Sequence, residues 1–344
     1  MKRYGNLLFA ILFTALFCLC IFSCKKEEEE EEILEDMSGE VEFSIPHYVL
    51  KGEVVTMEAY GILDPQDAQY RWYVSGLYED SLKSAKVTVR FPDSIGTFTV
   101  TAVAYDIHDE YYISSTRQDV KTIDTTFNTS LTSVERSPYA FTDERDGKIY
   151  HYVTVGSLDW FTQNLAYEEC GTSYMFSPMT SSLFGCLYDW ESATGGESAE
   201  GLGCGPRGAC PEGWTVPTNE DWEDLAYAVS GQYLSFDDAW KGVGQKLSAD
   251  ARFLGERMWP YCPDNLHTND YGWNALPVGS FIESSSSFTN DNAYGFWWSS
   301  SAKDKERAYY RYMYSDMDSF PMGFTLKSDF ATSVRCVRMH QQSL

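Results

Sequence analysis

The sequence has few basic residues and few histidines. Its 26 Lys and Arg stand against 51 Asp and Glu, which gives the 344 residues a formal net charge of -25. Because such a chain repels phosphate groups, we expect no nucleic acid partner. The five histidines are scattered and no histidine pair accompanies a closely spaced cysteine pair, so the sequence predicts neither a metal site nor a cofactor.

Cysteine is absent from residues 25–169, and this gap separates two groups. Three cysteines lie in the first 24 residues, and the other six are Cys170, Cys186, Cys204, Cys210, Cys262 and Cys336. An even number of cysteines in an oxidising compartment indicates disulfides. We therefore expect the second group to form structural disulfides.

Residues 1–24 are organised like an export signal. A basic start precedes an almost wholly apolar run, residues 7–22, and Ser23 places a small side chain directly before Cys24. The four residues that end at Cys24 resemble the lipobox of bacterial lipoproteins, which implies cleavage and acylation at this cysteine. The alternative, an uncleaved membrane-spanning helix, would need about 20 apolar residues. We expect Cys24 to anchor the protein to a membrane through lipid.

Residues 25–40 follow as an acidic tether. Their run of glutamates at 27–32 repels itself and cannot form a core. Its position beside the lipid-bearing cysteine resembles the surface-export signals of bacterial lipoproteins. We therefore expect the protein on the outer membrane, exposed at the cell surface.

Residues 41–124 are predicted to form an all-β sandwich. Apolar and polar residues alternate in short runs separated by turn residues, which is the pattern of half-buried antiparallel strands. Trp72 occupies the place of the buried tryptophan in an immunoglobulin-like strand. The stretch at residues 91–100 resembles the closing hairpin of polycystic-kidney-disease (PKD) and related Ig-like modules, which implies a spacer. The buried positions are expected to be Val41, Phe43, Ile45, Val55, Met57, Ala59, Tyr70, Trp72, Val74, Val87, Val89, Phe91, Phe98, Val100, Ala102 and Ala104.

Residues 125–138 are rich in Thr and Ser and are predicted to be a linker, or an extended edge segment, before a second domain, residues 139–340. That domain opens with a predicted hairpin, in which the strand after Asp146 and Gly147 turns back at residues 156–159. A helix is predicted to begin at Thr218, with Asp221 at the capping-box position, and to end at Gly231.

Six motifs in the second domain carry a family resemblance. They are FTDERDGKIYHYVTVGSLDWFTQNLAY from Phe141, FGCLYDWESA from Phe184, CPEGWTVPTNEDWEDL from Cys210, GWNALPVG from Gly272, YGFWWSSS from Tyr294 and SVRCVR from Ser333. Together they resemble the FISUMP domain, the Fibrobacter succinogenes major paralogous domain. The resemblance implies an α+β, C-type-lectin-like fold with long irregular loops. It also implies a disulfide between Cys210 and Cys336, which would stabilise by roughly 4 to 5 kcal/mol.

The other four cysteines, Cys170, Cys186, Cys204 and Cys262, allow three pairings, and the sequence does not choose among them.

Catalytic motifs are few. No G-x-S-x-G elbow occurs, and the G-x-G-x-x-G at residues 203–208 follows no predicted strand. Carboxylate pairs such as Glu220 with Asp224, or Asp316 with Asp318, arise by abundance in so acidic a chain. We therefore expect no enzymatic activity. The alternatives are a hydrolase acting on cell-surface polysaccharide and a structural component of the cell envelope.

A ligand-binding face is predicted at residues 308–314, which read AYYRYMY. In a strand, Tyr310, Tyr312 and Tyr314 would share one face, and Tyr309, Arg311 and Met313 the other. One face must join the core, together with Trp297 and Trp298, and the other would present aromatic rings and hydroxyls to a ligand. The candidate ligand-binding residues are Tyr309, Tyr310, Arg311, Tyr312 and Tyr314. The sequence thus predicts a lipid-anchored adhesin or receptor that binds a protein or glycan.

Overall fold

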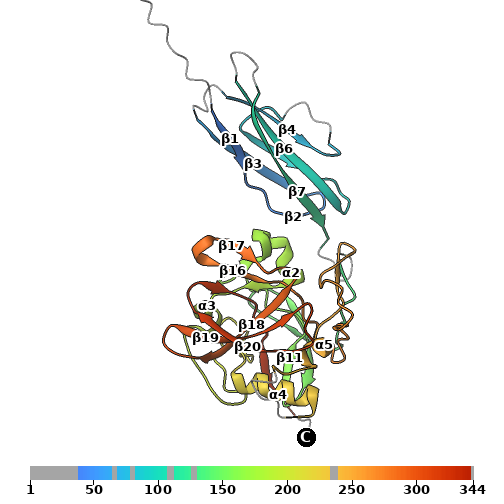
Figure 1. Ribbon diagram of the computed structural model, residues 1–344, viewed down its shortest axis with the longest axis vertical. Helices are drawn as coiled ribbons and strands as arrows, with labels where there is room; N and C mark the ends of the chain where they lie inside the picture. The colour runs from blue at the N-terminus through green and yellow to red at the C-terminus, as the bar shows by residue number, and fades with distance from the viewer. Residues whose placement is uncertain are drawn as a thin grey trace, which may run out of the picture. The chain divides into compact units, whose positions relative to one another are not determined.

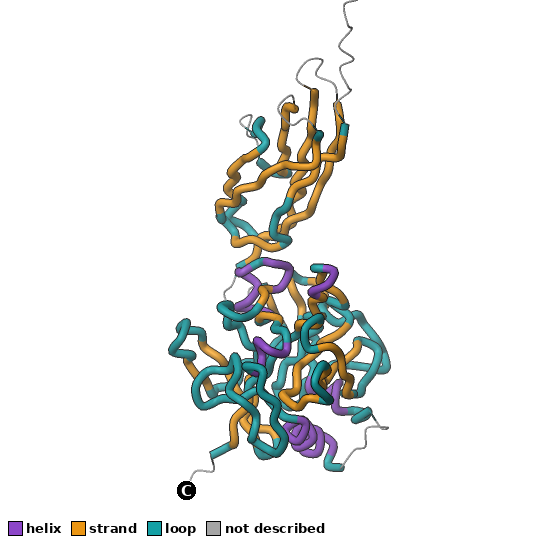
Figure 2. Tube along the Cα trace, turned by 90° about the vertical axis from the view of Figure 1, so that its left-hand side faces the viewer, coloured by secondary structure: helices purple, strands orange, loops and turns teal. Residues whose placement is uncertain are grey.

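The computed structural model describes residues 38–63, 68–77, 82–106, 112–124, 130–232 and 239–341. The predicted leader, the lipidation site at Cys24 and nearly all of the acidic tether lie outside these residues. The described chain is mostly β-sheet (Figures 1 and 2). No helix within the described ranges is long and apolar enough to cross a membrane.

The N-terminal region, residues 39–123, contains two sheets (Figure 1). One has the strand order β1-β3-β5 and the other the order β2-β7-β6-β4. All neighbours pair antiparallel except β2 and β7, which are parallel. The strands are β1 (Gly39–Phe43), β2 (Tyr48–Leu50), β3 (Val54–Ile62), β4 (Ala68–Val74), β5 (Lys86–Arg90), β6 (Gly96–Asp106) and β7 (Tyr112–Ile123).

Alternating side chains of both sheets meet in this region's core. Phe43 of β1 packs edge-on against Trp72 of β4, with ring centroids 5.1 Å apart. The Trp72 ring is 3% exposed and donates its Nε1–H to the Ser84 carbonyl at 2.9 Å. The alternation of the sequence predicted this core, although Phe98 is only half-buried. Strands β2 and β7 are additions that the alternation did not single out.

The predicted linker is only partly described, because residues 125–129 lie outside the described ranges. Its remaining part is not a free segment. Leu131–Thr132 form β8, which pairs with β14 (Arg252–Phe253), and the Glu135 N–H donates to Asn274 Oδ1 at 2.9 Å. Strand β8 lies at the edge of the sheet ordered β15-β14-β8, so this part of the stretch is the extended edge segment that the sequence left open as an alternative. Its pairing could not be predicted, since the strand partner is distant in sequence and leaves no local pattern.

The C-terminal region, residues 130–341, opens with the predicted hairpin. It consists of β10 (Ile149–Val155) and β11 (Leu158–Phe161), the middle of a four-stranded sheet ordered β22-β11-β10-β9. The outer strands are β9 (Ala140–Thr142) and β22 (Val337–Met339). The last strand of the region thus shares a sheet with the hairpin near its start.

Helix α4 (Asn219–Ser230) confirms the predicted signals at both ends. The Thr218 hydroxyl accepts the Asp221 N–H while the Asp221 carboxylate accepts the Thr218 N–H, which is a complete capping box. Gly231 ends the helix with a φ of 71°, in the left-handed region that favours glycine. The apolar stripe of α4 is buried, and Trp222 packs 4.7 Å from Trp160 of β11.

A second sheet of this region has the order β18-β19-β20, from β18 (Tyr294–Ala302), β19 (Arg307–Tyr314) and β20 (Met322–Leu326). Much of the remaining chain is loop with short elements between (Figure 2). These are η2 (Tyr174–Phe176), η3 (Pro178–Thr180), α2 (Ser181–Phe184), α3 (Trp190–Thr194), α5 (Val243–Leu247), η4 (Glu283–Ser285), β12 (Thr172–Ser173), β13 (Cys186–Leu187), β15 (Glu256–Arg257), β16 (Ser280–Ile282), β17 (Ser287–Thr289) and β21 (Phe330–Ala331).

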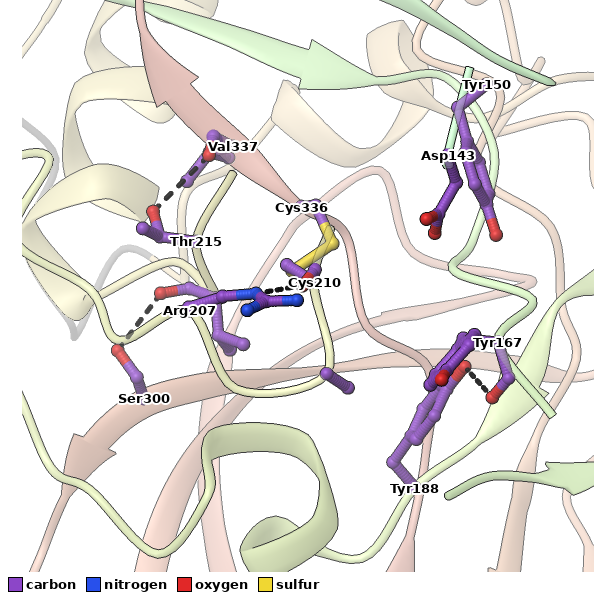
Figure 3. The surroundings of a disulfide bond; sticks show 12 residues. Asp143, Tyr150, Tyr167, Tyr188, Arg207, Cys210, Thr215, Ser300, Cys336 and Val337 are labelled. Carbon is purple, nitrogen blue, oxygen red and sulfur yellow. Dashed lines mark hydrogen bonds between the residues drawn. A yellow bond between two sulfur atoms is a disulfide. The ribbon is translucent and has the colours of Figure 1, made fainter. Parts of the chain in front are cut away.

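One disulfide joins Cys210 to Cys336 across 126 residues (Figure 3). Both cysteines are fully buried in a cluster with Trp214 and Phe161. This is the pairing that the family resemblance implied. The expectation of further disulfides is not met, because the other four cysteines are free thiols in different surroundings, with Cys186 buried, Cys204 exposed, and Cys170 and Cys262 between these extremes.

Candidate functional site

The register of β18 and β19 places their aromatic side chains opposite one another. Tyr294 pairs with Tyr314, Phe296 with Tyr312, and Trp298 with Tyr310. Directly opposed residues in an antiparallel pair project from the same face of the sheet. Six aromatic side chains therefore share one face, hereafter the tyrosine face.

At one end of the tyrosine face the rings form a continuous stack. Tyr294 lies between two rings, with its centroid 4.3 Å from that of Tyr314 and 5.3 Å from that of Phe296. Tyr312 is tilted beside them, 6.0 Å from Phe296. Rings that stack on one another shield much of each other's faces, so the stack leaves edges and hydroxyl groups for a partner.

The stack remains partly open to solvent. Tyr294, Tyr312 and Tyr314 are half-buried, whereas Phe296 beneath them is 7% exposed. None of the three hydroxyls has a hydrogen-bond partner among the residues that the structure describes. Each hydroxyl can therefore donate to and accept from a bound molecule.

Tyr310, at the other end of this face, belongs largely to the core. Its ring lies 5.4 Å from Phe330 and 5.6 Å from Phe296, and burial raises the pKa of its phenol. It also lies directly over Gly323 of β20, where an added Cβ would collide with the ring. Of the tyrosines predicted on this face, Tyr312 and Tyr314 are thus better placed for a ligand than Tyr310.

Arg311 is corrected as a ligand-binding candidate. It lies on the opposite face of β19 with Met313, and both are buried. Its guanidinium carbon sits 3.6 Å from the ring centroid of Trp240, a cation–π contact inside the core. The structure therefore leaves Arg311 without access to a surface ligand.

Tyr309 lies on the side of Arg311, near the start of the central strand β19, and is apart from the tyrosine face. It packs edge-on against Phe324 of β20, which is 45% exposed. Lys303 places its ammonium 2.9 Å from the centroid of the Phe324 ring. Tyr309 is therefore part of a separate small patch.

Residues 290–292, whose Asn and Asp side chains are of the kind that can bind a hard cation, form a turn. Asn290 and Asn292 have φ values of 62° and 59°, and the Asn292 amide donates to Asp291 Oδ2 at 3.2 Å. The Asp291 carboxylate also accepts from Tyr174 at 3.2 Å. In the described part of the chain, no group of three or more His, Cys, Asp or Glu side chains is arranged to hold a metal ion.

Sequence reasoning missed Tyr294 and Phe296 as members of the site. Their signal was present, because residues 294–298 alternate so that both share a face with Trp298. What was missing was the pairing of β18 with β19, which alone places them against Tyr312 and Tyr314.

Comparison with known families now identifies the C-terminal region. Residues 153–338 match the model of the Fibrobacter succinogenes major domain. The match covers more than half of the chain, and the protein therefore belongs to this family. No curated protein matches the sequence.

Proposed function

We propose that this protein is a lipid-anchored lipoprotein, exposed on the bacterial outer membrane, that acts as an adhesin or receptor without catalysis. Its ligand is a protein or a glycan, held by the C-terminal domain in an α+β, C-type-lectin-like fold. The N-terminal region serves as an Ig/PKD-like spacer. The lipobox at Cys24 and the acidic tether support the location, and two sheets with a shared core support the spacer.

The observation that carries the binding proposal is the tyrosine face. Tyr294, Tyr312 and Tyr314 combine half-exposed rings with unpartnered hydroxyls among the described residues. A stack held by its neighbours loses little conformational entropy on binding, which favours affinity. The ring edges and hydroxyl groups of these tyrosines can contact the hydroxyl groups of a sugar and the amides of a peptide equally well.

Of the carboxylate pairs first considered for hydrolysis, Glu220 and Asp224 have structural roles that favour binding without catalysis. Glu220 accepts the Gly201 N–H at 2.9 Å, and Asp224 accepts the Ser157 N–H at 2.6 Å. Each holds a loop against helix α4. A hydrolase would need such a pair facing its substrate across a cleft.

The test is an array of glycans and host-surface proteins probed with the chain from residue 25 onward. For any ligand found, replacing Tyr312 and Tyr314 together with alanine should weaken binding by tenfold or more, roughly the effect of losing a binding hot spot. Tyr312→Phe should give a smaller loss, because it removes only the hydroxyl. Tyr73→Ala is the matched control, since Tyr73 is 53% exposed but lies on β4 of the N-terminal region.

Unchanged affinity in the Tyr312 and Tyr314 variant, with the fold intact, would remove the tyrosine face from the proposal. Turnover of a bound glycan would instead favour the hydrolase, and silence across the array would favour a structural role. Mass spectrometry of the native protein tests the anchor, which predicts an acylated Cys24 at the mature amino terminus.

A further inference from the structure

A pocket apart from the tyrosine face lies among β8, β10 and the loop after β11, and a buried arginine lines it. Arg335 is 1% exposed, and its guanidinium carbon lies 4.0 Å from the ring centroid of Trp273. Guanidinium groups stay protonated in proteins, so this side chain carries a positive charge in the interior. Such a charge is costly unless something compensates it.

The partners of Arg335 are all neutral. Its Nε–H donates to Asn164 Oδ1 at 2.9 Å, and its Nη atoms donate to three backbone carbonyls. Among the described residues no carboxylate forms an ion pair with it. Four of the five N–H groups of a guanidinium are thereby used, and the charge itself remains unpaired.

The pocket beside this arginine offers further donors. Gln163 accepts the His151 N–H through Oε1 at 2.7 Å, and its amide nitrogen has no partner among the described residues. Arg136 stands exposed on the lining and donates its Nε–H to His151 Nε2 at 2.8 Å. The His151 ring accepts there and donates Nδ1–H to the Ser137 carbonyl at 2.7 Å, so its ring nitrogens are both engaged.

The rest of the lining is part polar, with Glu135, Thr162, Ser182 and Asn274, and part apolar, and the space is small. Leu131, Val134, Leu183 and Leu276 line it, which lowers the local dielectric and strengthens any charge interaction. Its volume of about 30 Å³ is enough for about two waters. The planar carboxylate group is of this size, whereas a sugar ring is not.

We propose that this pocket binds the carboxylate group of an acidic ligand. The carboxylate would take hydrogen bonds from Gln163 and Arg335, and the rest of the ligand would extend outward past Arg136. Two arginines, Arg136 and Arg335, line the pocket against one carboxylate, that of the exposed Glu135. An excess of positive charge is unexpected in a chain with a net charge of -25, and the unpaired buried guanidinium of Arg335 favours an anion. A uronic acid and an acidic amino acid share this chemistry.

The experiment uses the chain from residue 25 onward and small probes in solution. Acetate, D-glucuronate and N-acetylglutamate are titrated and followed by ligand-observed NMR and thermal melting, with acetamide and D-glucose as neutral counterparts. We expect the carboxylates to raise the melting temperature and to show saturation, and the neutral compounds to do neither. Glucuronate binding more tightly than N-acetylglutamate would indicate a polysaccharide source, and the reverse a peptide source.

Gln163→Glu is the decisive variant, because it places a carboxylate in the pocket with no change in shape. It should fold, melt at the same or a higher temperature, and lose at least tenfold in affinity for every carboxylate probe. Leu183→Phe, which fills the space, should have the same effect on binding. Equal responses to acetate and acetamide, or an unchanged affinity in both folded variants, would overturn the proposal and leave a water-filled structural pocket. Neither variant changes a residue of the tyrosine face. Failure of the carboxylate proposal can therefore be distinguished from failure of the proposed ligand binding at the tyrosine face.

Discussion

The two regions of this protein are stabilised in different ways. Residues 39–123 bury every second side chain of long strands and contain no cysteine. Residues 130–341 have short elements joined by loops, and contacts between distant segments hold them: a disulfide, a buried guanidinium bonded to three carbonyls, and clusters of tryptophan. The difference indicates that a few long-range contacts decide the stability of the C-terminal region. In the N-terminal region, stability comes from many similar contacts between alternating buried side chains.

The largest effect is expected from removing the disulfide. Replacing Cys210 and Cys336 together with alanine should lower the free energy of unfolding by about 5 kcal/mol, because the bond closes a loop of 126 residues in the unfolded chain. Hydrogen exchange by mass spectrometry should show lost protection in peptides of residues 130–341. Cys204→Ser, at an exposed free thiol, is the control and should change nothing. If the double variant were as stable as the unchanged protein, the view that a few long-range contacts stabilise the C-terminal region would be wrong.

Trp72→Ala should destabilise the N-terminal region by about 4 kcal/mol, since it empties the space between the two sheets. Exchange should then rise in peptides of residues 39–123, while β18 and β19 keep their protection. Trp72→Phe retains most of the ring and should cost less. Loss of protection in both regions would contradict the view that each region is stabilised by its own contacts.

Acid should weaken the C-terminal region through His267. This ring stacks on Trp259 at 4.9 Å, and burial lowers its pKa to about 4 from an ordinary value of 6.5. Because the folded state keeps the imidazole neutral, its stability is complete above pH 6.5 and falls as the pH drops towards 4, by about 3 kcal/mol. Chemical denaturation across this range should show the slope, and His267→Gln should flatten it. If the pH dependence of the free energy of unfolding is unchanged in the variant, titratable groups other than His267 cause it.

The smallest effect is expected at the start of α4. Thr218→Ala removes the hydroxyl that accepts the Asp221 N–H, and should lower the free energy of unfolding by about 1 kcal/mol. Thr218→Ser keeps the cap and should be close to neutral. Urea denaturation is sensitive enough to separate the two, and equal values would show that the cap contributes little.

Sequence patterns predicted those elements that depend on residues near one another in the chain. The strands around Trp72 followed from alternation, and α4 followed from Thr218, Asp221 and Gly231. Strand β8 did not, because Leu131 pairs with Phe253, more than a hundred residues away. The disulfide followed only from resemblance to the family, since spacing alone could not pair Cys210 with Cys336.

The candidate site was predicted in part for the same reason. Alternation assigned Tyr312 and Tyr314 to one face of a strand and Arg311 to the other, and this division is confirmed. Which face would be buried could not be read from it, because tyrosine and arginine each have apolar parts that can pack in a core. The position of Trp240 decided that Arg311 is inside.

The sequence by itself determined the strand periodicity, the helix ends and the strongly acidic character, because each depends on neighbouring residues or on composition. Only the tertiary structure decided that Tyr294 joins the tyrosine face and that Arg335 is buried beside a pocket without an ion-pair partner among the described residues. Both depend on segments brought together by folding, and the free energy of such contacts is set by the neighbours that surround a side chain in space.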